Sequence, residues 1–265
     1  MGMRELTLSI YPFYGHLDQA DPAWAEMLRL ARPRLQAIAD LGLSPDQALG
    51  PACSFHPDQA RHARGAAEAT RPIMLYRGRP LDSALPLLGI PTRYLPGGVT
   101  VMTGEEPACH SPEVLALRLA GGLLLDARAA EMVLHMGLGP AIGVSARLPD
   151  AGAVMEHPSD PAFGAGTVAP INLRYEGSSW QFAAAPGCRA ISALVDYRGQ
   201  TVGHGPLLYE SASGSRVAIL PWDSQAQVMV FGAPAQAFCS PGFLCWARQT
   251  QLLAILTWLN RGPLP

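Results

Sequence analysis

The chain has 265 residues, of which 49% are hydrophobic and 15% are charged, enough to bury the core of one large domain or two smaller ones. Its net charge of −2 and the lack of any cluster of basic residues argue against nucleic acid as a main partner. All 19 basic residues are Arg, so chemistry that needs a lysine nucleophile or Schiff base is excluded.

Five cysteines are scattered along the chain, at positions 53, 109, 188, 239 and 245. Their spacing favours neither a zinc site nor a redox motif, and an odd, unpaired set is typical of a reducing compartment. No segment reaches the roughly 18 consecutive apolar residues that indicate a transmembrane helix. We therefore expect a soluble, cytoplasmic protein that uses no metal and no cofactor and does not bind a membrane.

The first expected element is a strand over residues 6–11, which leads into the aromatic loop Tyr11–His16. A helix is expected to follow, with Pro22 at its first position and Gly42 at its end. Pro33 lies inside the apolar stripe of this helix, which predicts a kink or a break there.

Short helices and strands are expected to alternate between residues 80 and 145, after a mainly irregular stretch with room for one short strand. The expected elements are a strand at 52–55, a helix at 82–88, strands at 91–95 and 99–102, a helix capped by Ser111, a strand at 123–126 and a helix ending at Gly137. This alternation is typical of an α/β layer with a largely parallel sheet.

Residues 165–232 read as a β-rich stretch with Gly, Pro and Ser between short strands. Strands are expected at 171–175, 180–184, 191–196, 206–210, 216–220 and 228–231. Arg198-Gly199 and Ser213-Gly214 are typical of hairpin turns. A closing helix over 241–261 is apolar around most of its circumference, so we expect it to be buried between the sheet and another layer or subunit.

The turn after the strand at 123–126 is where many α/β enzymes place a nucleophile, because the helix N-terminus that follows lowers a thiol pKa and binds oxyanions. Here the turn is Asp126-Ala127-Arg128, with neither Cys nor Ser. His204-Gly205-Pro206 also has no adjacent Glu to complete a Cys-His-Glu arrangement. The sequence therefore argues against glutaminase activity.

Several short motifs together carry a resemblance to a known family. They are ADLGL at 39–43, GGLLLD at 121–126, LVD at 194–196, GPLLYE at 205–210 and GSRVAILP at 214–221. In this order they resemble the C-terminal half of bacterial glycoside hydrolases of the β-galactosidase kind. In that family a TIM barrel is followed by a trimerisation domain with a class I glutamine-amidotransferase-like fold.

The resemblance implies a boundary near residue 43. Residues 1–43 would match the last βα unit of the barrel, and residues 44–265 an amidotransferase-like, flavodoxin-like α/β domain with a β-rich portion and a closing helix. The seven preceding βα units, and with them both carboxylates of a retaining glycosidase, have no counterpart in the chain. The resemblance therefore implies no catalytic residue here, and a homo-oligomer or a second chain that supplies the rest of the barrel.

The aromatic loop would then sit at the catalytic face of a barrel, where βα loops carry function. Its side chains are suited to stacking on a sugar ring, or equally to a hydrophobic plug or subunit contact. The candidate ligand-binding residues are Tyr11, Phe13, Tyr14, His16 and Asp18.

Two sets of residues have metal-ligating side chains at short spacing, namely His56, Asp58 and His62, and Glu156, His157 and Asp160. The composition of the first stretch favours a solvated loop or a first helical turn, and that of the second favours a loop.

Two adjacent pairs have an alternative chemical interpretation. Cys109-His110 looks like a nucleophile–base pair, but consecutive residues on a strand face opposite sides, which favours a structural role. Glu105-Glu106 follows a strand end, where a desolvated acid pair could transfer protons, although such a pair is more often exposed.

The leading hypothesis from the sequence is a non-catalytic assembly or scaffold domain related to glycoside hydrolases. The alternatives are a carbohydrate-active hydrolase whose site is completed by another subunit, and a sugar-binding or small-ligand-binding module that uses the aromatic loop.

Overall fold

The computed structural model describes residues 22–42, 50–54, 85–86, 88–93, 98–150, 152–173, 180–222 and 245–261. The chain divides into two compact units, Met1–Ala48 and Leu49–Pro265. Within the described residues, no helix is both long enough and apolar enough to cross a membrane.

The described part of the first unit is helix α1 (Pro22–Asp40). It starts at the expected Pro22 and is followed by Gly42, which has a φ of +58° and donates its N–H to the carbonyl of Ala39. The break considered at Pro33 is wrong, because the helix continues through it. Pro33 is exposed, so water can bond to the carbonyl that loses its partner there.

The second unit is built around a six-stranded mixed sheet. Four neighbouring strands run parallel, and two more extend the sheet on one side, each paired antiparallel with its neighbour. In spatial order they are β1 (Ala52–Cys53), β2 (Thr100–Met102), β3 (Leu123–Leu125), β12 (Arg216–Ile219), β11 (Leu207–Glu210) and β8 (Arg189–Ala190). The expectation of an α/β layer with a largely parallel sheet is confirmed.

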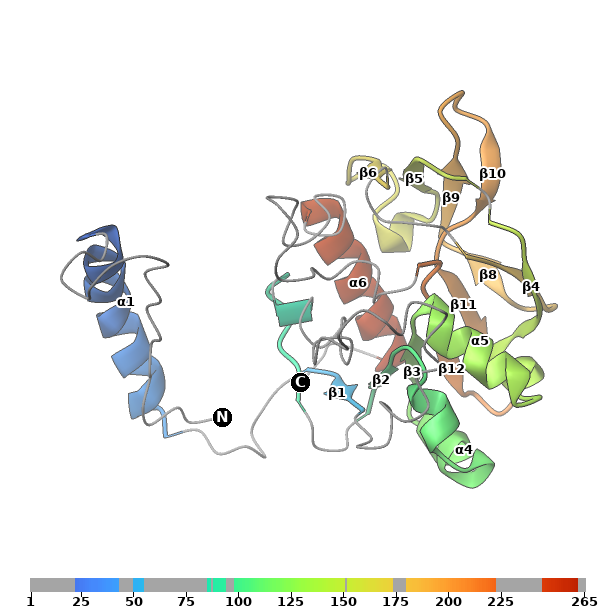
Figure 1. Cartoon of the computed structure of the whole chain (residues 1–265), viewed down its shortest axis with the longest axis horizontal. Helices are drawn as coiled ribbons and strands as arrows, with labels where there is room; N and C mark the ends of the chain where they lie inside the picture. Colours follow the sequence, from blue (N-terminus) through green and yellow to red (C-terminus); the bar gives the residue numbers. More distant parts are fainter. Residues whose placement is uncertain are drawn as a thin grey trace, which may run out of the picture. The chain divides into compact units, whose positions relative to one another are not determined.

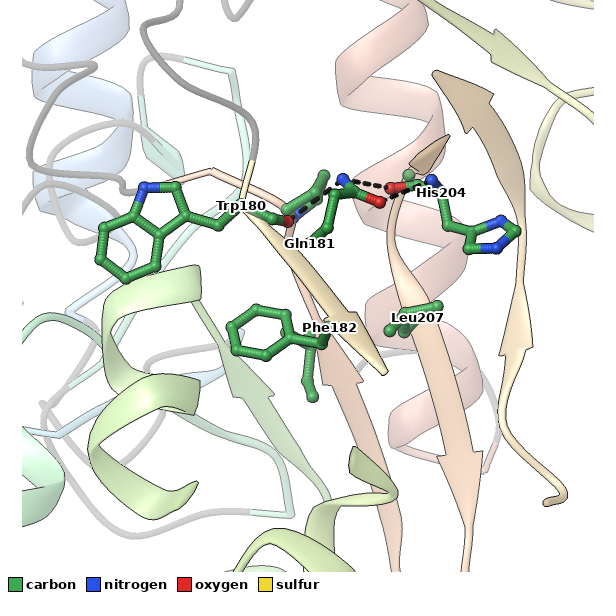
Figure 2. Close-up of a pocket in the computed structure, with 8 residues that line it drawn as sticks. Trp180, Gln181, Phe182, His204 and Leu207 are labelled. Atoms are coloured by element: carbon green, nitrogen blue, oxygen red, sulfur yellow. Dashed lines mark hydrogen bonds between the residues drawn. The ribbon is translucent and has the colours of Figure 1, made fainter. Parts of the chain in front are cut away.

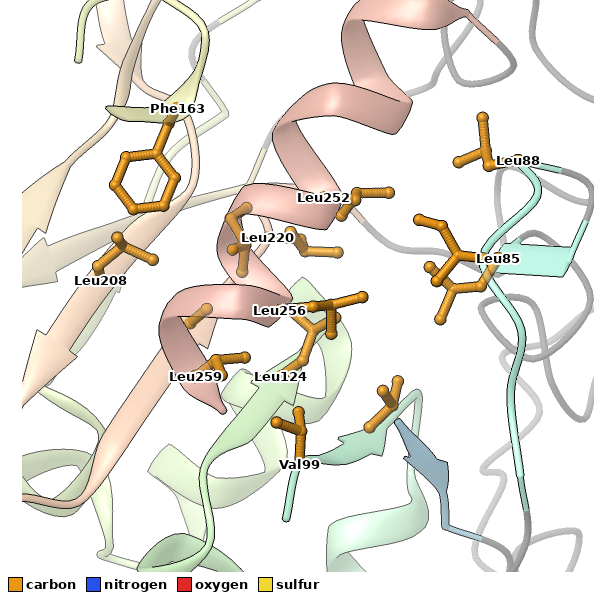
Figure 3. Packing of buried hydrophobic residues seen from close by; sticks show 14 of the residues in the cluster. Leu85, Leu88, Val99, Leu124, Phe163, Leu208, Leu220, Leu252, Leu256 and Leu259 are labelled. Atoms are coloured by element: carbon orange, nitrogen blue, oxygen red, sulfur yellow. The ribbon is translucent and has the colours of Figure 1, made fainter. Parts of the chain in front are cut away.

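Helices cover both faces of this sheet, because successive residues of each buried strand point to opposite sides. Leu124 packs with α6 (Trp246–Leu259) on one face, among the residues drawn in Figure 3. Leu123 and Leu125 pack on the other face with α4 (Pro112–Ala120) and α5 (Ala127–His135), which Figure 1 shows in green. The sheet is therefore the middle layer of three.

The start of α4 follows the sequence signals. The Ser111 hydroxyl accepts the N–H of Val114, with Pro112 at the first helical position. Three short 3₁₀ helices accompany the α-helices among the described residues: η3 (Glu106–Cys109), η4 (Gly139–Ile142) and η5 (Pro161–Phe163).

The β-rich portion adds two smaller sheets among the described residues. One has four strands in the order β10 (Thr201–His204), β9 (Ser192–Val195), β5 (Met155–Pro158) and β6 (Ile171–Asn172). The other pairs β4 (Val144–Leu148) with β7 (Gln181–Ala184). The hairpin turns expected at Arg198-Gly199 and Ser213-Gly214 join β9 to β10 and β11 to β12.

The closing helix is buried against the sheet, as its apolar circumference predicts. Leu252, Ile255 and Leu256 are fully buried among side chains of the sheet. Its first expected residues, and the strand expected at 228–231, lie outside the described residues. The strands β4, β5, β8 and β10 have no counterpart in the sequence-based expectations.

Candidate functional site

Loops from three parallel strands meet at one edge of the main sheet, the edge where open α/β sheets bind ligands. Thr103–Glu106 follow β2, Asp126 follows β3, and Pro221-Trp222 follow β12. The N–H of Ala127 donates to the carbonyl of Trp222 over 3.0 Å, which joins two of these loops. This edge is therefore the first place to look for chemistry.

Asp126 occupies the position where an enzyme of this architecture would carry its nucleophile. Its side chain is fully buried and accepts the N–H of Ala129 over 2.8 Å, which caps α5. Both carboxylate oxygens also accept the N–H of Gly104, over 3.0 and 3.2 Å. Gly104 has a φ of +60°, a conformation that side-chain-bearing residues rarely adopt. The carboxylate thus fastens the loop after β2 to the first turn of α5.

The backbone at this turn is relaxed. A nucleophile elbow holds its residue in a strained conformation. Asp126 instead has a φ of −76° and a ψ of 171°, which is ordinary extended backbone. Among the described residues, the only one other than Gly with a positive φ is Arg261, far from this turn in the sequence. The turn therefore has the geometry of a helix cap.

Four alternating charged side chains cross the edge beside this cap, and we call them the strand-edge network: Glu105, Arg128, Glu131 and Arg147. Arg128 donates to Glu105 over 3.0 Å and to Glu131 over 2.5 Å. Arg147 donates to the other oxygen of Glu131 over 2.8 Å. Burial alone would lower the pKa of Arg128, but hydrogen bonds and charge from Glu105 and Glu131 outweigh it and raise that pKa.

The strand-edge network ends on an aromatic ring. The guanidinium of Arg147 lies 3.9 Å from the centre of the Trp180 ring. Arg147 belongs to β4 and Trp180 precedes β7, so the ring contact lies within the two-stranded sheet. The ion pair of Arg147 with Glu131 connects that sheet to α5. These side chains fasten structural elements to one another.

Glu105 and Glu106 are both buried, so the expectation of an exposed pair is wrong. The reason is that η3 turns both side chains inward, where each meets a basic partner. Glu106 lies 3.2 Å from Nε2 of His110, across one helical turn. Cys109 instead directs its Sγ to the backbone carbonyl of Glu105 over 3.9 Å. Cys109 and His110 lie in and beside a 3₁₀ helix, so the strand geometry considered for them is wrong.

A small hollow lies between β7 and the end of β10. Its empty volume is about 180 Å³, which includes space open to solvent. Figure 2 shows Trp180, Phe182 and Leu207 around it, with Gln181 reaching His204. The Gln181 amide accepts the N–H of His204 over 2.8 Å and donates to its carbonyl over 3.1 Å. Ligand sites usually enclose at least about 300 Å³, so this hollow is smaller than a typical small-molecule site.

Cys188 packs against the buried core cluster on the α4–α5 side of the sheet, and its thiol has a shifted pKa. Burial raises the pKa of its thiol from 9.0 to about 11, against a smaller lowering by the N–H of Arg189. A thiol with so high a pKa is a poor nucleophile at neutral pH.

The candidate residues of the aromatic loop, Tyr11, Phe13, Tyr14, His16 and Asp18, lie outside the described residues, as does the set His56, Asp58 and His62. A sugar site on that loop stays a prediction.

The set Glu156, His157 and Asp160 is not brought together. Glu156 and His157 are neighbours on β5, with Glu156 buried and His157 exposed. Asp160 caps η5 and pairs with Arg189 over 2.5 Å. The loop favoured for Glu156 and His157 is therefore wrong, because pairing with β9 makes the segment a strand. No group of three His, Cys, Asp or Glu side chains that could hold a metal ion occurs in the part of the chain that the structure describes.

Sequence reasoning missed the partners of the acidic residues. Arg128 lies three residues before Glu131 on a helix, and this spacing is a signal for an ion pair. Arg147 and Trp180 come together across 33 residues of chain through β4–β7 pairing, so no local pattern points to their contact.

No family model matches the chain, and no curated protein matches it. Among solved structures the chain is similar to Agd3, described as a novel carbohydrate deacetylase, with a TM-score of 0.42 and 12% sequence identity. The similarity covers 82% of this chain and 33% of that one, so the chain spans about a third of the length of Agd3.

Proposed function

We propose that the chain is a non-catalytic assembly domain related to glycoside hydrolases of the β-galactosidase kind, with an amidotransferase-like fold over residues 44–265. One observation carries the proposal. The group at the nucleophile position, the Asp126 carboxylate, is buried and accepts hydrogen bonds from the backbone N–H groups of Gly104 and Ala129.

A catalytic carboxylate has to reach substrate, and a nucleophile needs a free lone pair aimed at the reacting atom. Asp126 has no exposed surface, and both of its carboxylate oxygens accept the backbone N–H of Gly104. The neighbouring acids at the same edge, Glu105 and Glu131, share Arg128. Because these acids form ion pairs with an arginine of the same domain, this edge supports a scaffold role.

Exposed apolar side chains support assembly. Leu117 on α4 and Trp246 on α6 each expose 75% of their surface. The two helices cover opposite faces of the sheet, so each residue is a separate candidate for a subunit contact. We infer a homo-oligomer, or a second chain that supplies the missing part of a barrel, as the partner.

The oligomeric state tests the assembly role. We expect the purified chain to elute as an oligomer in size-exclusion chromatography with light scattering, over a wide range of concentrations. Leu117→Glu and Trp246→Glu should each lower the mass if that residue lies in the interface, whereas Thr257→Glu, at an exposed polar position of α6, serves as the control. A well-folded wild-type chain that is strictly monomeric would contradict the proposal.

A catalytic assay tests the second part of the proposal, that the domain is non-catalytic. We expect no turnover of a panel of nitrophenyl glycosides, or of glutamine, by the pure oligomer at high concentration. Turnover that Asp126→Asn abolishes while the far-ultraviolet circular dichroism stays unchanged would overturn the non-catalytic assignment.

A further inference from the structure

A second set of charged side chains lies inside the β-rich portion, away from the strand edge. We call it the buried polar cluster, and it consists of Glu156 on β5, Ser192 at the start of β9, and Arg248 and Gln251 on α6. Each member exposes at most 1% of its surface. The cluster therefore joins the four-stranded sheet to the closing helix in the interior.

Glu156 is the centre of this cluster. Its Oε1 accepts the hydroxyl of Ser192 over 2.6 Å and the amide of Gln251 over 2.5 Å. Its Oε2 accepts Nη1 of Arg248 over 2.8 Å. The same Nη1 donates to Oε1 of Gln251 over 2.6 Å, so Arg248 and Gln251 hold the carboxylate from two directions.

Other residues pack closely around the buried polar cluster. The Arg248 guanidinium lies 3.8 Å from the centre of the Trp222 ring. A Cβ on Gly205 would lie 1.7 Å from the Ser192 hydroxyl and 3.0 Å from Oε1 of Glu156. Only Gly fits there with Ser192 in this rotamer, so the chain after β10 closes over the cluster.

The apolar contacts at this joint have no directional preference. Among the described residues, the buried apolar cluster between the four-stranded sheet and α6 consists of Ile171, Leu173, Leu194 and Ala247, with Ala153, Val168 and Cys245 packed against it. Such contacts tolerate sliding, because apolar burial depends on area and not on orientation. A slide of α6 by one turn, about 5.4 Å, would carry Arg248 away from Glu156 and leave a buried charge without its partner.

We propose that the buried polar cluster is a conformational lock, which selects one seating of the four-stranded sheet on α6 and contributes little net stability. Desolvation of a buried ion pair offsets most of the attraction between its charges. The hydrogen-bond geometry of Glu156 is what distinguishes this seating from its neighbours. The proposal does not depend on the assembly role, since it concerns contacts inside one chain.

The test compares the full-length wild-type chain with Glu156→Leu/Arg248→Met, which replaces the pair by apolar side chains. We expect the double variant to unfold within a few degrees of wild type. Its amides in β5 and β9 should nevertheless exchange with deuterium at least about tenfold faster, while those of β3 and β12 keep their protection. Glu156→Gln, which removes the carboxylate charge that Arg248 contacts over 2.8 Å, should lower the unfolding temperature well below that of the double variant.

The matched control is Glu210→Gln, which removes a carboxylate from the partly exposed pair Glu210–Arg216 on β11 and β12. It should leave exchange in β5 and β9 unchanged. Two results would overturn the proposal. One is full wild-type protection of β5 and β9 in the double variant, and the other is failure of the double variant to fold, which would make the pair a source of stability. If only Glu156→Gln fails to fold, deuterium exchange in β5 and β9 of the double variant still tests the proposal.

Discussion

The strand-edge network and the buried polar cluster both pair glutamates with arginines, but they differ in their access to water. Arg128 and Arg147 keep 28% and 43% of their side-chain surface exposed, whereas Glu156 and Arg248 expose none. In the strand-edge network, water weakens the attraction between the charges and also solvates them. In the second set each charge depends on its protein partner.

The difference shows how the same residue types serve two purposes in one domain. Around the strand edge, charges fasten the loop after β2 and the β4–β7 sheet to α5, and the arginines keep contact with water if one pair is lost. In the buried polar cluster, the loss of either Glu156 or Arg248 removes the opposite charge from the other buried side chain. Substitutions should therefore have graded effects that follow burial.

Arg248→Met should have the largest effect. It leaves the Glu156 carboxylate buried with Ser192 and Gln251 but without its cation, which should cost about 3–5 kcal/mol. Urea unfolding followed by circular dichroism measures the loss. A cost near that of an exposed pair would remove the distinction between the two regions.

Asp126→Ala should come next, at about 2 kcal/mol. It removes the cap of α5 and leaves the N–H groups of Gly104 and Ala129 without that acceptor. The matched control is Ser111→Ala, which removes the exposed cap of α4 and should cost about 1 kcal/mol or less. Equal losses in the two variants, measured by the same unfolding experiment, would show that Asp126 is no more than an ordinary cap.

Arg147→Met should cost about 1 kcal/mol or less, because its pair with Glu131 is partly exposed and Met can still cover the Trp180 ring. The loss should shrink further in high salt, which screens such pairs. Arg29→Met, in the exposed pair with Glu26 on α1, is the control and should be close to neutral. A salt-independent loss of several kcal/mol would place the strand-edge network in the same class as the buried polar cluster.

Cys188 should show the smallest effect on stability and a clear one on reactivity. Burial raises the pKa of its thiol to about 11, so at pH 8 only about one part in a thousand is thiolate in the folded chain. The unfolded chain ionises near pH 9.0, so stability is unaffected below that pH and falls as the pH rises toward 11.

Alkylation with iodoacetamide at pH 8, followed by mass spectrometry of the Cys188 peptide, measures this reactivity. The thiol should react much more slowly in the folded chain than in urea. Equal rates would contradict the burial of the thiol.

Elements with a local chemical signal were predictable from the sequence. Ser111-Pro112 starts α4, and Gly137, with a φ of +78°, follows α5. The turns Arg198-Gly199 and Ser213-Gly214 lie where they were expected, although β10, which completes the first hairpin, was not expected. In each case two or three adjacent residues restrict the backbone, so the signal survives without knowledge of the rest of the chain.

Strand β5 was not predictable in this way. Its sequence, Met155–Pro158, carries a Glu, a His and a Pro in place of an apolar alternation, and its pairing partner β9 lies more than 30 residues later. Likewise, four of the five residues of β4 are exposed, so no buried face marks it as a strand. Pairing between distant segments made both of these strands.

The sequence by itself determined the mixed α/β layering, the caps and turns, and the missing Cys or Ser after β3, because each depends on residues next to one another. Only the tertiary structure decided what the charges do. Glu105, Glu131 and Glu156 are all acids that a sequence places at the surface by default. Burial, together with Arg128, Arg147 and Arg248 reaching Glu105, Glu131 and Glu156 from other elements, sets their roles, since the energy of a charge depends on its partners and on its distance from water.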